Sequence, residues 1–163
     1  GKCKLATVSF GHGIATTLLQ LSKAYSIISN GGYDITPTLI KKDRLKRQRI
    51  LNDNLSETIN PILRKIVSTK EGTAGFANVK GYEVGGKTGT ADQPLEGGYS
   101  KKKVNTFASV FPTSDPKFVL AVMLDEPKAN REFVYHYRDD RYPYKGNWRN
   151  TAGWTTVLSL IHI

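Results

Sequence analysis

The sequence predicts an α+β fold in which helices flank an antiparallel sheet. Residues 17–30 place apolar side chains at helical spacing, which predicts an amphipathic helix. Two apolar segments, 105–111 and 118–124, are joined by the turn sequence PTSDP, which predicts an antiparallel hairpin. Helical patterns lie both before and after these strands, and this order of elements is typical of an α+β domain.

The first predicted helix covers residues 17–30 (TLLQLSKAYSIISN). From Leu18, apolar residues recur at i+3, i+7 and i+10, which builds one apolar face. Thr17 is the predicted N-cap, since a threonine side chain accepts a hydrogen bond from the first helical turn. Gly31 and Gly32 follow the last apolar residue and predict the end of the helix.

An extended segment containing Pro37 leads from this helix into a basic run, residues 41–50 (KKDRLKRQRI). The run holds six basic residues against Asp43, so it supplies six minus one, or five, of the chain's net charge of +10. Such a run is most often the solvated face of a loop, and that is the prediction here. The alternatives are a phosphate-binding patch or a contact with an anionic membrane or cell-wall polymer.

Residues 56–69 form the second helical pattern, and Pro61 interrupts it. A proline has no N–H to donate, so it is unfavourable this deep in a regular helix capped at Ser56. Two alternatives stay open. Either the first turn is distorted, or the regular helix starts at Asn60 with Pro61 in its first position.

The middle of the chain predicts a glycine-punctuated loop over 70–81, a strand over 82–90, a connection over 91–100 and a strand over 105–111. Residues 118–124 (FVLAVML) are continuously apolar. A run without alternation predicts a central strand that is covered on both faces.

The C-terminal third is less regular. Residues 128–150 are aromatic and charged without a period, which predicts a long surface loop, and 150–158 resemble the first turns of a helix. The last six residues, 158–163 (LSLIHI), resemble the translation of an adaptor used in sequencing libraries, so we expect only residues 1–157 to be native, as the C-terminal part of a larger domain. No nucleic-acid partner is predicted, because the aromatic residues of the loop show no repeated stacking pattern.

Composition excludes several classes of protein. A hydrophobic content of 39% is sufficient for a buried core. No apolar run reaches the roughly 18 residues of a membrane span, and no signal peptide is visible. One cysteine, Cys3, cannot form an internal disulfide, and the three histidines are too scattered to predict a metal site (His12, His136, His162). No cofactor is implied.

The candidate functional segment is the predicted strand around Lys87, which lies between the glycine pair 85–86 and the run Thr88, Gly89, Thr90. The lysine supplies a fixed positive charge, and glycines allow the backbone of a ligand to approach. An extended substrate would then add to the strand by main-chain hydrogen bonds, with the hydroxyl groups suited to a carboxylate. A backbone N–H near the strand end can face a developing oxyanion. The tripeptide KTG alone is more often part of an ordinary exposed strand.

Five motifs in fixed order make the signal more specific: SFGHGIATTLLQLSKAYSIISNGG, GTAGFANVKGYEVGGKTGTAD, GGY, FASVFPTSDPKFVLAVMLDEP and TAGW. Together they resemble the C-terminal part of the transpeptidase domain of class B penicillin-binding proteins, and most of all that of the septal, division-specific D,D-transpeptidases. The resemblance covers residues 6–157. It implies part of the fold shared by penicillin-binding proteins and serine β-lactamases.

The family's site combines S-x-x-K, which carries the nucleophilic serine, with S-x-N and K-T-G. The K-T-G motif stands at residues 87–89, within the segments that carry the resemblance, and we expect the motifs with the nucleophilic serine and with S-x-N upstream of Gly1. The resemblance implies acyl transfer: the serine attacks D-Ala-D-Ala of one stem peptide, and an acceptor amine resolves the acyl-enzyme into a cross-link. Penicillins would acylate the same serine. The 163 residues alone are expected to be inactive and to lack strand partners for their sheet.

The resemblance also implies a role for each residue of the motif. Lys87 would act electrostatically on the substrate carboxylate and would take part in the proton network of the site. Thr88 and Thr90 would donate hydrogen bonds to that carboxylate, and the Thr90 N–H would complete an oxyanion hole with the N–H of the serine. Gly89 would keep the strand approachable.

The implied partners are peptidoglycan stem peptides, β-lactams and division proteins that include a glycan polymerase. The implied location is the inner membrane, through an N-terminal anchor outside this sequence, with the domain in the periplasm. The alternatives are an elongation-specific transpeptidase, a D,D-carboxypeptidase and a β-lactam-sensing receptor domain. The remote alternative is a basic interaction module in which KTGT is accidental.

Overall fold

The computed structural model describes residues 2–9, 11, 13–41, 46–96, 98–128, 134–136 and 143–145. Its elements, in chain order, are α1 (Lys2–Val8), α2 (Leu18–Ser29), β1 (Tyr33–Ile35), β2 (Arg47–Arg49), α3 (Leu55–Ser68), the 3-10 helix η1 (Gly75–Ala77), β3 (Gly85–Leu95), β4 (Gly98–Phe111), β5 (Phe118–Asp125), β6 (Val134–His136) and β7 (Pro143–Lys145).

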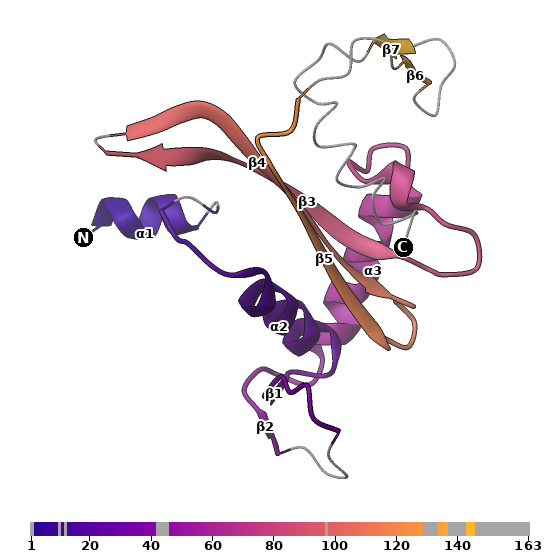
Figure 1. The fold of residues 1–163 in the computed structure, drawn as a ribbon. Helices are drawn as coiled ribbons and strands as arrows, with labels where there is room; N and C mark the ends of the chain where they lie inside the picture. Colours follow the sequence, from indigo (N-terminus) through magenta and orange to yellow (C-terminus); the bar gives the residue numbers. More distant parts are fainter. Residues whose placement is uncertain are drawn as a thin grey trace.

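The largest sheet is antiparallel, with the strand order β3-β4-β5 (Figure 1). This sheet and its helices confirm the predicted α+β class, and the β4–β5 pair confirms the predicted hairpin. The prediction that 118–124 is the central strand is wrong within the described residues, where β4 is central and β5 pairs with β4 alone. Phe118 is 61% exposed and Met123 is 47% exposed, so a continuous apolar run here does not mean burial on both faces.

The predicted connection over 91–100 is also wrong, because most of it is strand. The last β4–β5 pair is Val104 with Asp125, but the β3–β4 ladder continues to the pair Leu95 and Gly98, with a register shift between Asp92 and Pro94. The hairpin therefore projects past β5 (Figure 1). A strand at the edge of a sheet tolerates proline, since the missing N–H removes no ladder bond there.

Helix α2 agrees closely with its prediction. The Thr17 hydroxyl accepts a hydrogen bond from the Gln20 N–H at 3.1 Å, and the Gln20 side chain accepts one from the Thr17 N–H at 2.9 Å. These two bonds form a capping box. After the helix, Gly31 and Gly32 have φ of +87° and +83°, which favour glycine, and a Cβ on Gly32 would lie 2.6 Å from the carbonyl oxygen of Leu51.

Helix α3 begins at Leu55, so a start at Asn60 is wrong, and Pro61 lies inside the helix. Ser56 does not cap the helix. Its hydroxyl donates to the carbonyl of Ile28 and accepts from the N–H of Gly31, both at 2.7 Å, which ties α3 to the end of α2. Tertiary packing of the apolar face thus outweighs the backbone bond that proline cannot make.

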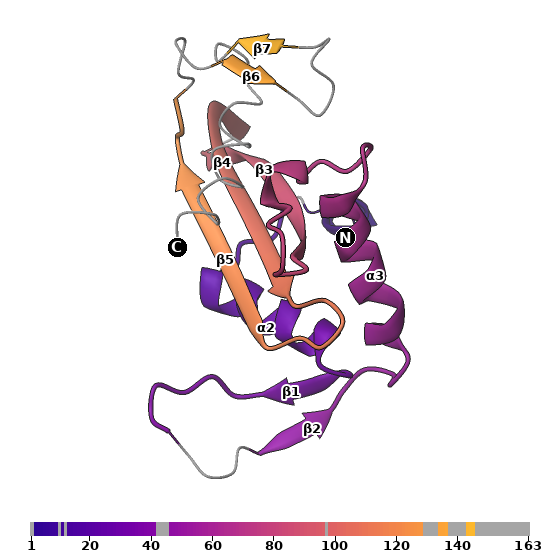
Figure 2. The ribbon, with the colours of Figure 1, turned by 90° about the vertical axis from the view of Figure 1, so that its right-hand side faces the viewer.

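Part of the basic run is a strand rather than a loop. Arg47–Arg49 forms β2 and pairs with β1, and all three of its residues are exposed, as expected for a solvated face. The guanidinium groups of Arg47 and Arg49 lie 4.9 and 4.6 Å from the centre of the Tyr33 ring, and Arg49 donates to the Tyr33 hydroxyl at 2.9 Å. This two-stranded sheet stands at one end of the molecule, away from β3 (Figure 2).

The predicted surface loop over 128–150 contains a short two-stranded sheet, because β6 and β7 pair in antiparallel fashion. The predicted helical turns over 150–158 and the predicted adaptor-derived tail over 158–163 lie outside the described residues.

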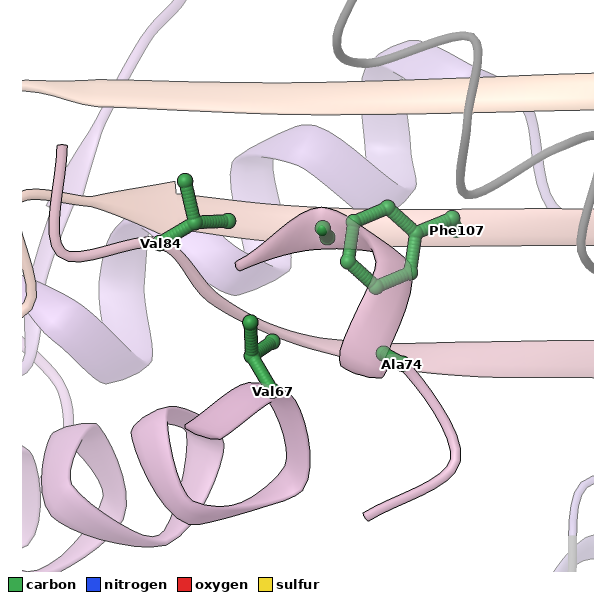
Figure 3. Close-up of a cluster of buried hydrophobic side chains, with 5 residues drawn as sticks. Val67, Ala74, Val84 and Phe107 are labelled. Carbon is green, nitrogen blue, oxygen red and sulfur yellow. The ribbon is translucent and has the colours of Figure 1, made fainter. Parts of the chain in front are cut away.

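The hydrophobic core lies between β3, β4, α3 and η1. Its buried members are drawn in Figure 3: Val67, Ala74, Ala77, Val84 and Phe107. Phe107 comes from the central strand and has the largest of the fully buried side chains, with 0% exposure. The α3 helix and the segment that follows it are therefore packed onto the same aromatic ring that supports β3.

Replacing this ring tests the importance of the core. In the full-length protein, we expect Phe107→Ala to lower the free energy of unfolding by about 3–5 kcal/mol, because it leaves a cavity. Urea denaturation followed by circular dichroism measures the loss. The matched control is Phe118→Ala, whose ring is mostly exposed and should cost about 1 kcal/mol. Equal losses for the two variants would contradict a core centred on Phe107.

Candidate functional site

The four residues 87–90 lie in the middle of β3, which confirms that the motif is on a strand. They face residues 105–108 of the central strand in regular antiparallel register, with Lys87 opposite Ala108 and Thr90 opposite Asn105. Among the described residues β3 pairs with β4 alone, so no described strand pairs with its other edge.

The start of β3 is held by α3. The Arg64 guanidinium donates to the carbonyl of Val84 at 2.8 Å and to the side-chain oxygen of Asn78 at 2.9 Å. A Cβ on Gly85 would lie 2.9 Å from the backbone nitrogen of Arg64 and 2.4 Å from the Thr113 side chain. The helix backbone therefore approaches the strand so closely that only glycine fits.

Gly86 is also a packing residue. A Cβ on it would lie 2.6 Å from the carbonyl oxygen of Ala108 and 2.7 Å from the Phe107 ring, and Gly86 is buried. The sequence suggested that the glycine pair 85–86 serves ligand access. The structure instead gives both glycines a role in bringing β3 against the core.

Gly89 is half-buried, and a Cβ on it would lie 2.5 Å from the Thr106 hydroxyl oxygen. Thr106 is the register partner of Gly89 on β4, and its side chain lies close to the glycine. The space left by the missing side chain is thus partly taken by β4.

The polar groups of the motif lie at the surface. Lys87 is exposed, and its ammonium donates to the carbonyl oxygen of Thr88 at 2.7 Å. Within the described residues no ion pair involves this lysine. Thr88 is half-buried and Thr90 is exposed. The strand therefore presents a positive charge with two hydroxyl groups close to it in the chain.

A further hydroxyl joins them from outside the strand. The side-chain oxygens of Thr73 and Thr88 lie 3.1 Å apart, slightly longer than a typical hydrogen bond between hydroxyl groups. Thr73 belongs to the glycine-punctuated segment between α3 and η1. Sequence reasoning missed it, because no periodic pattern in 70–81 marks one residue above the others.

Chemically, this arrangement is suited to an anion on an extended chain. The ammonium group attracts a carboxylate, hydroxyl groups donate to it, and the open strand edge can align the backbone of a ligand. No group of three or more His, Cys, Asp and Glu residues in the described part of the chain could hold a metal ion. Nor does any helix there have the length and apolar character to cross a membrane.

Comparison with known proteins assigns these features to a family. Residues 2–140 match the family model described as the penicillin binding protein transpeptidase domain. The chain is 35% identical over 133 residues to a probable peptidoglycan D,D-transpeptidase PenA of Neisseria flavescens, covering 79% of the chain and 32% of the relative. It is 36% identical over 138 residues to a probable peptidoglycan D,D-transpeptidase FtsI of Caulobacter vibrioides, covering 77% and 23%. The chain thus spans a third or less of these relatives.

Solved structures agree with the sequence matches. The transpeptidase domain of Burkholderia pseudomallei penicillin-binding protein 3 superposes with a TM-score of 0.77 and 30% identity, covering 99% of this chain and 45% of that one. Penicillin-binding protein 3 of Mycobacterium tuberculosis in complex with ampicillin gives a TM-score of 0.68 and 26% identity, covering 96% and 37%.

The packing role of the glycine pair can be tested on stability. Gly86→Ala should lower the free energy of unfolding of the complete domain by about 1–3 kcal/mol, because its methyl group meets backbone and an aromatic ring. Gly98→Ala is the matched control, since nothing lies within 4 Å of a Cβ there, and we expect a change within about 0.5 kcal/mol. Thermal unfolding compares the two. A Gly86→Ala protein as stable as the Gly98→Ala protein would refute the packing role.

Proposed function

The chain belongs to the transpeptidase domain family of the penicillin-binding proteins, within class B, and on this premise we propose that it is part of a septal peptidoglycan D,D-transpeptidase. The observation that carries the proposal is the exposed Lys87 on β3, flanked by the hydroxyl groups of Thr88 and Thr90. This arrangement suits the terminal carboxylate of a D-Ala-D-Ala stem peptide.

The proposed reaction is acyl transfer through a serine ester. The serine oxygen attacks the carbonyl carbon between the two D-alanines, and the tetrahedral intermediate collapses as the C–N bond breaks and the terminal D-Ala leaves with a proton on its amine. An amine of a second stem peptide then attacks the ester, which releases the serine and forms the cross-link. The S-x-x-K patterns of the printed sequence, at 100–103 and 114–117, lie on strand β4 and in the turn after it, and the nucleophile is proposed to lie in a preceding segment of the same protein.

Each residue of the motif has a proposed task. The Lys87 ammonium attracts the substrate carboxylate, and the Thr88 and Thr90 hydroxyl groups donate to it. The Thr90 N–H, together with the N–H of the serine, binds the oxygen on which negative charge develops. Gly89 keeps side-chain atoms away from the backbone of the bound peptide. In the present structure Lys87 donates to the carbonyl of Thr88, a bond that the bound carboxylate would replace.

β-Lactams are the proposed inhibitors. They combine a reactive amide with a carboxylate, so the same serine and the same strand would engage them, and the solved relative with bound ampicillin supports this proposal. Slow hydrolysis of the resulting ester would leave the serine blocked. The isolated 163 residues are proposed to be inactive, because half of the acyl-transfer groups come from elsewhere in the protein.

The cellular setting follows from the proposed reaction. Stem peptides are the proposed substrates, and a glycan polymerase and other division proteins are the proposed partners. The protein would be held in the inner membrane by an N-terminal anchor, with this domain in the periplasm. No cofactor and no nucleic acid enter the proposal.

Removing the lysine tests the assignment. In the full-length protein, we expect Lys87→Ala to lower the second-order rate constant of acylation by a fluorescent penicillin by on the order of 100-fold, because a fixed charge at the reacting groups is lost. Gel fluorescence against time measures the rate. The matched control is Lys65→Ala, which removes an exposed lysine of α3 and should leave the rate unchanged. A Lys87→Ala protein that reacts at the wild-type rate would refute the role of Lys87.

A further inference from the structure

A side-chain hydrogen bond reaches the motif from outside β3 and β4, because the hydroxyl groups of Thr73 and Thr88 form a pair. Thr88 belongs to the strand, whereas Thr73 comes from the segment after α3. Thr73 is exposed and Thr88 is half-buried, so the pair lies where a ligand on the strand could reach it.

The segment that carries Thr73 is held firmly on both sides of that residue. Gly72 is buried, and a Cβ on it would lie 2.0 Å from the carbonyl oxygen of Ile66, so the chain turns directly against α3. The Ala74 N–H donates to the same carbonyl at 3.2 Å, and Ala74 is fully buried. The position of Thr73 is therefore set by the end of the helix rather than by its own side chain.

The same core fixes the backbone at both threonines. Ala74, next to Thr73, and Phe107, the register partner of Thr88, belong to one buried cluster (Figure 3). A shift of the backbone at either threonine relative to the other would disturb that cluster. The distance between Thr73 and Thr88 is thus a property of the packed structure.

From this geometry we propose that Thr73 is a positioning residue for Thr88, an inference that rests on the proposed function. A threonine hydroxyl has one hydrogen to donate and two lone pairs to accept with. If Thr88 donates its hydrogen to the substrate carboxylate, it has none left for Thr73, so the Thr73 hydroxyl must be the donor in their bond. Thr73 then directs the Thr88 hydrogen toward the carboxylate and makes Thr88 a better donor.

Loss of the Thr73 hydroxyl should slow acylation mainly by ligands that carry the carboxylate. Thr73→Val keeps the shape of the side chain and replaces its hydroxyl by a methyl group. The Thr88 hydroxyl would then be free to turn its hydrogen away from the ligand. We expect acylation of the full-length protein by a penicillin to slow by about fivefold to tenfold, the effect of one neutral hydrogen bond. The methyl ester of the same penicillin, which lacks the charge, should be affected much less. Thr73→Ser should restore the wild-type rate.

The experiment measures the acylation rate constant for acid and ester with wild type, Thr73→Val, Thr73→Ser, Thr88→Val and the double variant. In the Thr88→Val background, Thr73→Val should have no further effect. The matched control is Thr58→Val, an exposed threonine in the first turn of α3 whose hydroxyl bonds to the carbonyl of Asn54. Thermal unfolding of each variant verifies that the domain is intact.

Two outcomes would overturn the inference while leaving the proposed function in place. In the first, Thr88→Val slows acylation and Thr73→Val does not. In the second, Thr73→Val slows acid and ester equally, which indicates a purely structural effect. A different outcome reaches further: if Thr88→Val itself acylates at the wild-type rate, the role of Thr88 in the proposed function is wrong, and the inference about Thr73 fails with it.

Discussion

The close approach of two elements to the glycine pair at the start of β3 is the constraint on which the rest of the structure depends. The backbone of α3 lies against Gly85, and the Phe107 ring lies against Gly86. A side chain at either position would push the strand away from the core. Because Lys87 follows directly, the same contacts that bury the pair determine where the lysine and its neighbouring threonines lie.

Strand β3 therefore changes from buried to exposed at the first residue of the motif. Gly85 and Gly86 are buried, whereas Lys87 and Thr90 are exposed on the same strand. An exposed charge on an open strand is weak as a binding site, because water screens it. In the proposed enzyme, the remainder of the domain would cover this surface and exclude water, which would strengthen each polar contact to the substrate. The chain covers 45% of a solved relative.

Local patterns predicted those elements whose signals lie within a few residues. The capping box of α2 is formed by Thr17 and Gln20, three residues apart. The helix ends just before Gly31 and Gly32, because both residues have positive φ angles, which favour glycine. Prediction failed where distant contacts decided the outcome. Ser56 was predicted as a helix cap, but its hydroxyl donates to a carbonyl at the end of α2. The apolar run 118–124 was predicted as a central strand, but among the described residues it pairs with β4 alone.

By itself, the sequence determined helix α2, the antiparallel hairpin of β4 and β5, and the strand that carries the motif at 87–90, since each depends on residue type and short spacing. The order of motifs was sufficient to indicate the family. Tertiary structure alone decided that the glycine pair serves packing and that Thr73 lies beside Thr88, fifteen positions along the chain. The physical reason is that close packing brings residues together without regard to their separation in sequence, so no local pattern records the contact.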